Sequence, residues 1–435
     1  MIIRSYASAD RSSDDSRLTC TLFLFVSVTL HALLLACTVV LAHLARSALP
    51  VSDATKRYLG TPRAALLNFT ETCAAHRYRA EEHRVRTADG YLLTVFRVGR
   101  AGCAPRRPPV LLMHGLLQSA DAFLDPGPRA GLPYLLADRC FDVWVGNMRG
   151  NYYARRHETL DPDRDAAFWD FGVEEIGLHD IPATIDYVLR HTGARKLNYV
   201  GFSQGSGTFF VMCSEVPGAC DKVNVHIGLA PAARQTHTRS VIYRAFAATL
   251  RKLRGVLAMA GYNEVLARGA LGHEFLAFMC HLSWKSEKLC GTAEAMFDSF
   301  HPGSISNDTL FNMFGHFPAG TSLKTFVRYA QSFESPRFAK FDYGEERNRR
   351  EYGDTRPPSY NLSAVTAPSV ILYGRNDHLV DVQDVAWLVR RLPRVLEATE
   401  VAEPLWNHFD CTYSRHIPDM IFPTVYKYLL RYSVT

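Results

Sequence analysis

Several features that define other classes of protein are missing from this chain of 435 residues. No two of its ten cysteines form a C-x-x-C pair, which argues against zinc ribbons and thioredoxin-type redox sites. The formal net charge is only +6 and the basic residues are scattered, so nothing indicates nucleic-acid binding. There are no internal repeats and no low-complexity tracts. With 47% hydrophobic and 21% charged residues, the composition is that of a globular protein.

Charged residues are also missing from the stretch between Arg17 and Arg46, which is almost wholly apolar. It is longer than a typical signal-peptide core and reaches the ~20 residues needed to span a bilayer. Residues 1–47 are therefore predicted to be either a cleaved signal peptide or an uncleaved signal anchor, in which residues 19–44 would cross the membrane once. Both interpretations send the remaining chain into the secretory pathway.

Glycosylation and disulfide formation are both possible in that compartment. Three N-x-S/T sequons without a blocking proline lie at Asn68, Asn307 and Asn361, and they are predicted glycosylation sites. Two cysteines, Cys20 and Cys37, belong to the apolar leader. The other eight can form disulfides, although the sequence does not determine how they pair.

Short apolar runs separated by helical patterns predict an α/β fold with a mostly parallel sheet flanked by helices. Asp-Gly at residues 89–90 lies between two strand-like stretches and predicts a hairpin over 81–98. A helix is expected over 176–193, with Gly193 as its stop. The runs expected as buried strands are Val110–Met113, Phe141–Val145, Leu197–Val200, Val223–Ile227 and Ser369–Tyr373.

The alternation of strand and helix stops between residues 232 and 355, where only helical patterns are found. This segment is predicted to be a helical cap, or lid, inserted into one core made of residues 48–231 and 356–435. The helix expected over 241–261 either packs on the core or presents an apolar face to lipid. The residues of that face are Ile242, Phe246, Leu250, Leu253 and Leu257.

The sequence Gly201-Phe202-Ser203-Gln204-Gly205 fits the pattern G-x-S-x-G. It follows a strand-like run and precedes a stretch, Gln204 to Val216, that can form a helix. A strand, a sharp turn and a helix with serine at the tip form the nucleophile elbow of α/β-hydrolases. Ser203 is therefore predicted to be the catalytic nucleophile.

A serine nucleophile needs a histidine base and a carboxylate, which follow it in this order along the chain: serine, acid, histidine. Asp377 follows the strand expected at 369–373, and Asp381 is the alternative acid. His408 follows the last strand-like stretch and precedes a closing helix expected over Pro418–Tyr432, so it is the predicted base. Two other late histidines are less well placed: His378 adjoins the acid and His416 lies close to that helix.

An oxyanion hole is expected after the strand at 110–113. In the loop that begins His114-Gly115, the backbone N–H of Leu116 is the first predicted donor, and that of Gln204 is the second. His114 is interpreted as a residue that shapes the loop. No metal site and no cofactor are predicted, because no cluster of His, Glu and Cys has ligand spacing.

From about Leu59 to the C-terminus the chain resembles the acid lipase family, the gastric and lysosomal acid lipase group of α/β-hydrolases. The resemblance assigns the nucleophile to Ser203, the acid to Asp377, the base to His408 and the oxyanion donors to Leu116 and Gln204. Its motifs are AEEHRVRTADGYLLTVFRV, LLMHGLLQSA, DVWVGNMRGNYYARRH, FWDFGVEEIGLHDIPATIDYVL, GFSQGSG, HFPAGTSLKTFVRYAQ, YGRNDHLVDVQDV and WNHFDCTYS.

The resemblance implies a lipase that hydrolyses triacylglycerols or cholesteryl esters of long-chain fatty acids at a lipid–water interface or membrane surface. It also implies a secreted or lysosomal protein and a disulfide between Cys280 and Cys290 in the cap. The chain departs from the family at Phe202, where histidine is common, and in its longer, more apolar leader. Two alternatives stay open: a lipid-binding protein without catalysis, and a short-chain esterase or thioesterase of the same fold.

Overall fold

The computed structural model describes residues 52–433, apart from residues 59, 105–106, 282–290 and 293. The predicted leader, residues 1–47, and Cys290 lie outside the described residues, so the anchor and the Cys280–Cys290 disulfide stay predictions. Within the described part of the chain, no helix is both long enough and apolar enough to cross a membrane.

Eight strands form one sheet in the order β1-β2-β4-β3-β5-β6-β9-β10. The six strands from β4 to β10 run parallel, whereas β2 pairs antiparallel with both β1 and β4. The expected mostly parallel sheet is thus confirmed. The predicted hairpin is the β1–β2 pair. The strands are β1 Arg79–Arg86, β2 Leu92–Gly99, β3 Val110–Met113, β4 Val143–Gly146, β5 Leu197–Phe202, β6 Val223–Leu229, β9 Ser369–Tyr373 and β10 Val395–Glu400.

Side chains of the central strands alternate between two apolar layers, one on each face of the sheet. In β3, Leu111 and Met113 belong to one layer, while Val110 and Leu112 belong to the other. Successive side chains of a strand point to opposite faces, so a strand covered on both sides must be apolar throughout. This explains why the buried strands are continuous apolar runs in the sequence.

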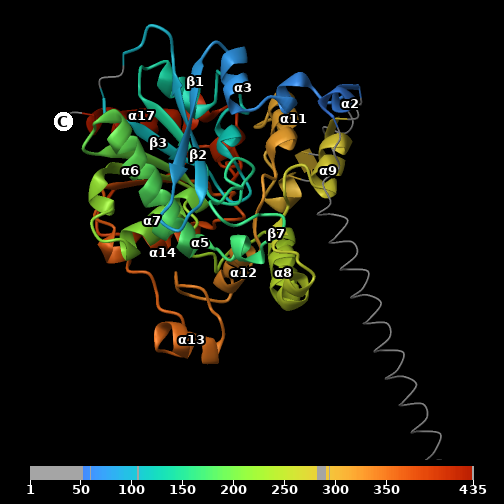
Figure 1. The fold of residues 1–435 in the computed structure, drawn as a ribbon. Coiled ribbons are helices and arrows are strands. Elements are labelled where there is room, and N and C mark those ends of the chain that lie inside the picture. Colours follow the sequence, from blue (N-terminus) through green and yellow to red (C-terminus); the bar gives the residue numbers. More distant parts are fainter. Residues whose placement is uncertain (1–51, 59, 105–106, 282–290, 293, 434–435) are drawn as a thin grey trace, which may run out of the picture.

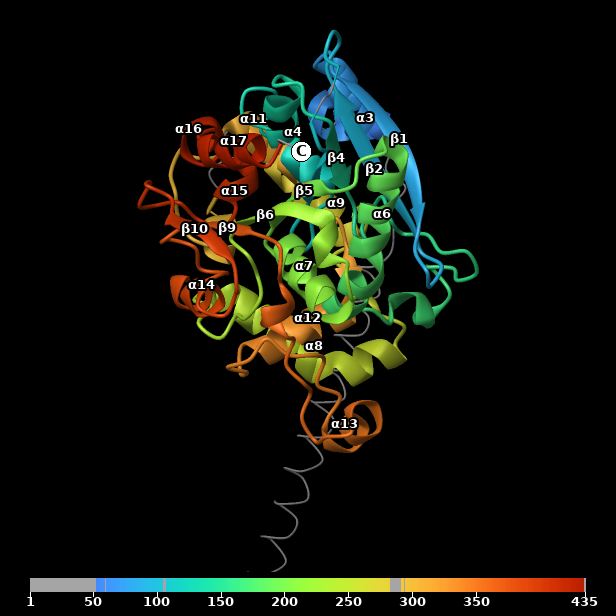
Figure 2. The same ribbon diagram turned by 90° about the vertical axis from the view of Figure 1, so that its left-hand side faces the viewer.

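Helices cover both faces of the sheet, as the two views in Figures 1 and 2 show. The layer that contains Met113 also contains residues of α6, α7 and α14, and the opposite layer contains residues of α3, α4 and α17. Gly193 ends α6 in the left-handed conformation, as expected. The helices outside the segment between β6 and β9 are α2 Asp53–Tyr58, α3 Phe69–Ala75, α4 Leu132–Ala137, α5 Val173–Glu175, α6 Ile181–Thr192, α7 Gln204–Glu215, α14 Val382–Val389, α15 Asp410–Tyr413, α16 Ile417–Met420 and α17 Phe422–Arg431.

Between β6 and β9 the chain is mainly helical, and in Figure 1 it lies to the right of the sheet and below it. Two short buried strands, β7 Glu264–Val265 and β8 Thr321–Ser322, pair antiparallel, which corrects the expectation of helices alone. They are too short to leave an apolar run in the sequence. The helices here are α8 Val241–Met259, α9 Leu271–His281, α11 Asn307–His316, α12 Leu323–Ser332 and α13 Glu345–Tyr352.

Two details of the predicted helices are wrong. In α8 the expected face is buried at Leu250 and Leu257, together with Tyr243 and Ala247, but Ile242 is 39% exposed. The expected closing helix is two helices, α16 and α17, because Pro423 lies in the first turn of α17. Proline suits the first turn of a helix and disrupts its interior.

Four cysteines form disulfides that the sequence did not pair. Cys103 is bonded to Cys140, and Cys213 is bonded to Cys220. Two others, Cys73 and Cys411, are buried free thiols.

Candidate active site

Ser203 lies between the end of β5 and the start of α7, at the predicted sharp turn. Its backbone has φ 50° and ψ −115°, a conformation that L-amino acids rarely adopt. The turn fits only because its neighbours are glycines. A Cβ on Gly205 would lie 2.3 Å from the carbonyl oxygen of Met113, and one on Gly201 would lie 2.7 Å from the amide nitrogen of Ser206. The glycines of the motif therefore let the turn lie against β3 and the start of α7.

The structure brings Ser203, Asp377 and His408 together in a hydrogen-bonded row. Nε2 of His408 lies 2.8 Å from Oγ of Ser203, and Nδ1 of His408 lies 2.7 Å from Oδ2 of Asp377. The other oxygen of Asp377 accepts hydrogen bonds from the backbone N–H groups of Leu379 and Val380 at 2.8 and 2.6 Å. All three side chains are buried. This is the geometry in which a histidine can take a proton from a serine hydroxyl.

The environment of His408 favours its protonated form. Burial alone would lower the pKa of the imidazole, but the charge and hydrogen bond of Asp377, together with the charge of Asp298, raise the pKa of His408 above its usual value of 6.5. The carboxylate also fixes the tautomer, because it accepts the proton on Nδ1 and leaves the lone pair of Nε2 facing Ser203.

The alternative acid has a structural role in the fold. Asp381 begins α14, where its side chain accepts a hydrogen bond from the backbone N–H of Gln383 at 2.9 Å. Asp381 also pairs with Arg239 at 2.9 Å. Its carboxylate is therefore engaged as a helix cap and an ion-pair partner.

The loop after β3 lies beside the elbow, since Met113 at the end of β3 pairs with Gly201 at the end of β5. Gln118 holds this loop in shape by accepting a hydrogen bond from the N–H of Gly115 at 2.9 Å. His114 accepts a hydrogen bond at Nε2 from the N–H of Met148 at 3.1 Å, and burial lowers its pKa to about 4. His114 is thus a neutral, loop-shaping residue in this structure.

Both predicted oxyanion donors lie at this junction. Leu116 lines the pocket around Ser203. Gln204 is the first residue of α7, so its N–H is among those that have no partner within the helix. Tyr329 of the cap donates a hydrogen bond to the Gln204 side chain at 3.0 Å.

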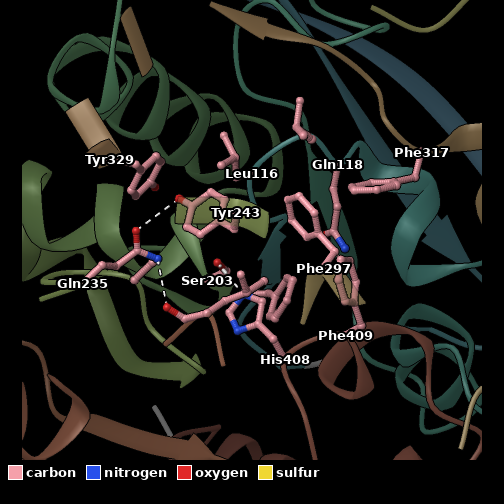
Figure 3. A pocket seen from close by; sticks show the side chains of 14 residues that line it. Leu116, Gln118, Ser203, Gln235, Tyr243, Phe297, Phe317, Tyr329, His408 and Phe409 are labelled. Carbon is pink, nitrogen blue, oxygen red and sulfur yellow. Dashed lines mark hydrogen bonds between the residues drawn. The ribbon is translucent and has the colours of Figure 1, made fainter. Parts of the chain in front are cut away.

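Aromatic and apolar side chains surround the serine, as Figure 3 shows. Four aromatic rings come from the cap: Tyr243 lies on α8 and Tyr329 on α12, while Phe297 and Phe317 lie outside these helices. The sequence analysis did not identify this lining, because nothing in the local pattern separates an aromatic residue of a pocket from one of the core. The remaining lining residues are Leu116, Leu117, Gln118, Phe202, Ala232, Gln235, Leu379, His408 and Phe409.

Phe202, where the resembling family commonly has histidine, is buried directly beside the predicted base. Its ring centroid lies 4.8 Å from that of His408. The ring also covers Gly115, where an added Cβ would come within 2.8 Å of it. An apolar ring therefore supports the imidazole from the side and leaves its two nitrogens to Ser203 and Asp377.

Outside this pocket, one group of side chains in the described residues has ligand atoms close enough to hold a metal ion. Glu81 and His83 of β1 and His191 of α6 place these atoms within 4.8 Å of one another. None of the three lines the pocket around Ser203.

The predicted glycosylation sites Asn68, Asn307 and Asn361 are all exposed. An acceptor asparagine has to be accessible, so their positions suit the modification, which stays a prediction.

Comparisons with known proteins identify the family and the fold. Residues 69–126 match the family described as a partial alpha/beta-hydrolase lipase region, and residues 108–237 match the alpha/beta hydrolase fold. Lipase 1 of Drosophila melanogaster is 39% identical over 363 residues, covering 82% of this chain and 78% of the relative. Gastric triacylglycerol lipase of Homo sapiens is 32% identical over 376 residues, covering 84% of this chain and 92% of the relative.

Solved structures share the fold. A monoglyceride lipase from Saccharomyces cerevisiae superimposes with a TM-score of 0.51 at 13% identity, covering 82% of this chain and 96% of that one. A protein from Sulfolobus solfataricus gives a TM-score of 0.55 at 14% identity, covering 85% and 97%. The predicted α/β-hydrolase fold is therefore confirmed.

Proposed function

Because this chain belongs to the acid lipase family of α/β-hydrolases and is a carboxylic ester hydrolase, we propose that it hydrolyses long-chain fatty-acid esters, triacylglycerols or cholesteryl esters, at a lipid–water interface or membrane surface. The observation that carries this proposal is the 2.8 Å contact between Ser203 and His408 inside an aromatic pocket. Such a pocket suits an acyl chain, whereas a polar one would suit a small charged acid.

In the proposed reaction, Oγ of Ser203 attacks the ester carbonyl carbon while Nε2 of His408 takes the hydroxyl proton. The carbonyl oxygen becomes an oxyanion that accepts hydrogen bonds from the N–H groups of Leu116 and Gln204. His408 then gives its proton to the departing alcohol oxygen, which leaves an acyl group on Ser203. Water, activated by the same histidine, releases the fatty acid and restores the serine.

Asp377 and the two backbone donors lower the activation barrier of this reaction in different ways. Asp377 keeps the imidazole in the right tautomer and stabilises its cation, since the carboxylate lies 2.7 Å from Nδ1. The two backbone donors act on charge that develops only in the transition state. One such donor accounts for roughly 10²- to 10³-fold in rate in serine hydrolases.

The cap, residues 232–355, is proposed to act as a lid. Ser203 is only 5% exposed, and Tyr243, Phe297 and Tyr329 of the cap line its pocket. A lipid ester can therefore reach the serine only when this layer is displaced. Large apolar side chains on the outside of the cap suit contact with lipid, and these are Met259, Phe275, Met296 and Phe300, each at least 58% exposed.

We also place the protein in the secretory pathway, either secreted or in the lysosomal lumen. The disulfides Cys103–Cys140 and Cys213–Cys220 suit an oxidising compartment. The apolar leader would direct the chain there, as a cleaved signal peptide or as a single-pass anchor through residues 19–44. N-terminal sequencing of the mature protein distinguishes the two, because only cleavage removes these residues.

The proposal is tested with an acyl-chain-length series on purified protein at pH 5 and pH 7.5. We expect emulsified long-chain esters to be hydrolysed faster than soluble short-chain ones. Ser203→Ala should lower kcat by at least about 10⁴-fold. Ser214→Ala, at the far end of the same helix α7, is the matched control and should keep wild-type activity.

Three results would contradict the proposal. Activity retained in Ser203→Ala would show that Ser203 is not the nucleophile. A preference for soluble short-acyl esters would indicate an esterase or thioesterase, and failure of Ser203 to react with a fluorophosphonate probe would indicate a lipid-binding protein without catalysis.

A further inference from the structure

One carboxylate of the cap reaches the backbone of both loops that carry the proposed acid and base. Asp298, between α9 and α11, is 2% exposed. Its Oδ2 accepts a hydrogen bond from the N–H of His408 at 2.7 Å, and its Oδ1 accepts one from the N–H of His378 at 3.0 Å. The N–H of Phe409 is a longer donor to Oδ2 at 3.4 Å. A single side chain thus joins the loop after β9 to the loop after β10.

The residues that follow Asp298 bind the same two loops. Asn407 donates from Nδ2 to the carbonyl oxygen of Ser299 at 2.8 Å, and Asn376 donates from Nδ2 to the carbonyl oxygen of Phe300 at 3.2 Å. The hydroxyl of Ser299 in turn donates to the carbonyl oxygen of Asn376. This segment of the cap is therefore fixed to the residues immediately before Asp377 and His408.

The charges around Asp298 make its burial costly. Burial first, and then the charge of Asp377, raise the pKa of Asp298 above its usual value, while His408 and the backbone donors act in the opposite direction. Glu294 from the same segment adds a second buried carboxyl, and burial together with Asp298 raises the pKa of Glu294 as well. The thiol of Cys411, on α15, also faces this group of charges.

A buried carboxyl with little compensation lowers stability unless its hydrogen bonds are worth more than its desolvation. Buried groups with strongly shifted pKa values are found most often at functional sites. Here the two shortest contacts of Asp298 go to the backbone of His408 and to His378, the residue directly after Asp377.

We propose that Asp298 is a positioning residue of the catalytic centre, supplied by the cap: its carboxylate holds the backbone of His408 and His378 and thereby keeps the imidazole between Ser203 and Asp377. This inference rests on the proposed function of Ser203, Asp377 and His408. It also means that the backbone around Asp298 has to stay docked on the His408 loop while other parts of the cap are displaced to admit the ester.

The experiment compares the wild type with Asp298→Asn and with the control His301→Gln. His301 lies on the same segment of the cap and binds Asp410 on the His408 loop at 2.7 Å, yet it is bonded to neither His408 nor His378. Four quantities are measured from pH 5 to pH 9: the rate at which a fluorophosphonate labels Ser203, kcat and KM for a soluble p-nitrophenyl ester, and the thermal midpoint.

For Asp298→Asn we expect the labelling rate and kcat to fall roughly 10- to 100-fold with KM nearly unchanged, since a small displacement of a reacting group has effects of this size. The acid limb of both profiles should move to lower pH, because the charge of Asp298 raises the pKa of His408. His301→Gln should lower the thermal midpoint and leave the acid limb in place.

Wild-type labelling and pH dependence in Asp298→Asn would overturn the inference. So would an equal rate loss in both variants with an unmoved acid limb, because Asp298 would then only dock the cap. If the Asn variant does not fold, Asp298→Glu replaces it, because this substitution keeps the charge but displaces it by one methylene. Its labelling rate should fall while the acid limb stays in place. A wild-type labelling rate in Asp298→Glu would also contradict the inference. A wild type that the probe does not label would refute the proposed function itself.

Discussion

The ring of Phe202 lies against the imidazole of His408, with the two planes tilted by 42° and the centroids 4.8 Å apart. The residue just before the proposed nucleophile thus supports the proposed base, which lies 206 positions further along the chain. What this position requires is a flat ring that fills the space between His408 and Gly115, and histidine also meets that requirement.

Replacing this ring by a methyl group should affect both stability and catalysis. Phe202→Ala is expected to lower the free energy of unfolding by about 3–5 kcal/mol, because it leaves a cavity in the core. Phe202→His keeps a ring in place, and its activity should stay within about tenfold of the wild type. Urea unfolding and ester hydrolysis measure the two effects. A Phe202→Ala variant as stable as the wild type would show that the ring is not packed as described.

The pH dependence follows from the charge beside His408. A general base must be neutral, and the raised pKa of His408 means that kcat/KM for a soluble ester should fall as the pH drops through a value above 6.5. Asp377→Asn removes the charge that raises this pKa, so the acid limb should move to lower pH and kcat should drop on the order of 10⁴-fold.

Asp381→Asn is the matched control for that substitution, because Asp381 lies in the same loop and caps α14. The asparagine can still accept the capping hydrogen bond, so stability should change by less than about 1 kcal/mol and kcat should stay near the wild-type value. If Asp381→Asn lost activity as Asp377→Asn does, the acid would be assigned wrongly.

A buried ion pair should be important for stability. Arg149 binds Asp180 and Asp89 through contacts of 2.6–2.9 Å, and its guanidinium lies 3.8 Å from the ring centroid of Tyr91. Arg149→Met would leave the fully buried carboxylate of Asp180 without its cation, and we expect a loss of about 3–5 kcal/mol. The double variant Arg149→Met/Asp180→Leu should recover part of it in urea unfolding. A single variant with wild-type stability would contradict this account.

The two disulfides should differ in how much they contribute to the stability of the fold. Cys103 and Cys140 are 37 residues apart, whereas Cys213 and Cys220 are 7 apart. A bond that closes a longer loop restricts the unfolded chain more. Replacing Cys103 and Cys140 by serine should cost about 2–4 kcal/mol, and more than the same change at the other pair. Thermal unfolding of the two double variants measures both losses of stability. A larger loss at Cys213 and Cys220 would rule out the loop-entropy explanation.

Local signals in the sequence were enough to predict the elbow and its partners. Gly201 and Gly205 around Ser203 are required by close contacts with the backbone, and such requirements leave a readable pattern. Asp377 and His408 were identifiable because each follows a strand of one parallel sheet, whose carboxyl ends meet at one edge.

The rest of the site depends on packing between distant parts of the chain. Tyr243 faces the pocket and Ile242 faces solvent, although the helical pattern of α8 favoured Ile242 for the buried face. The carboxylate of Asp298 has no sequence signal at all, since its partners are backbone N–H groups about 80 to 110 residues further along the chain. By contrast, Pro423 could have indicated the break between α16 and α17.

The order of the strands has a consequence for how the protein is made. The ribosome completes Ser203 long before His408, and at about 5–20 residues per second the 205 residues between them take roughly 10 to 40 s. β9 and β10 join the sheet at one edge, next to β6, so the earlier strands can assemble first. During synthesis Ser203 therefore exists without the proposed base, and we expect the incomplete chain to lack esterase activity.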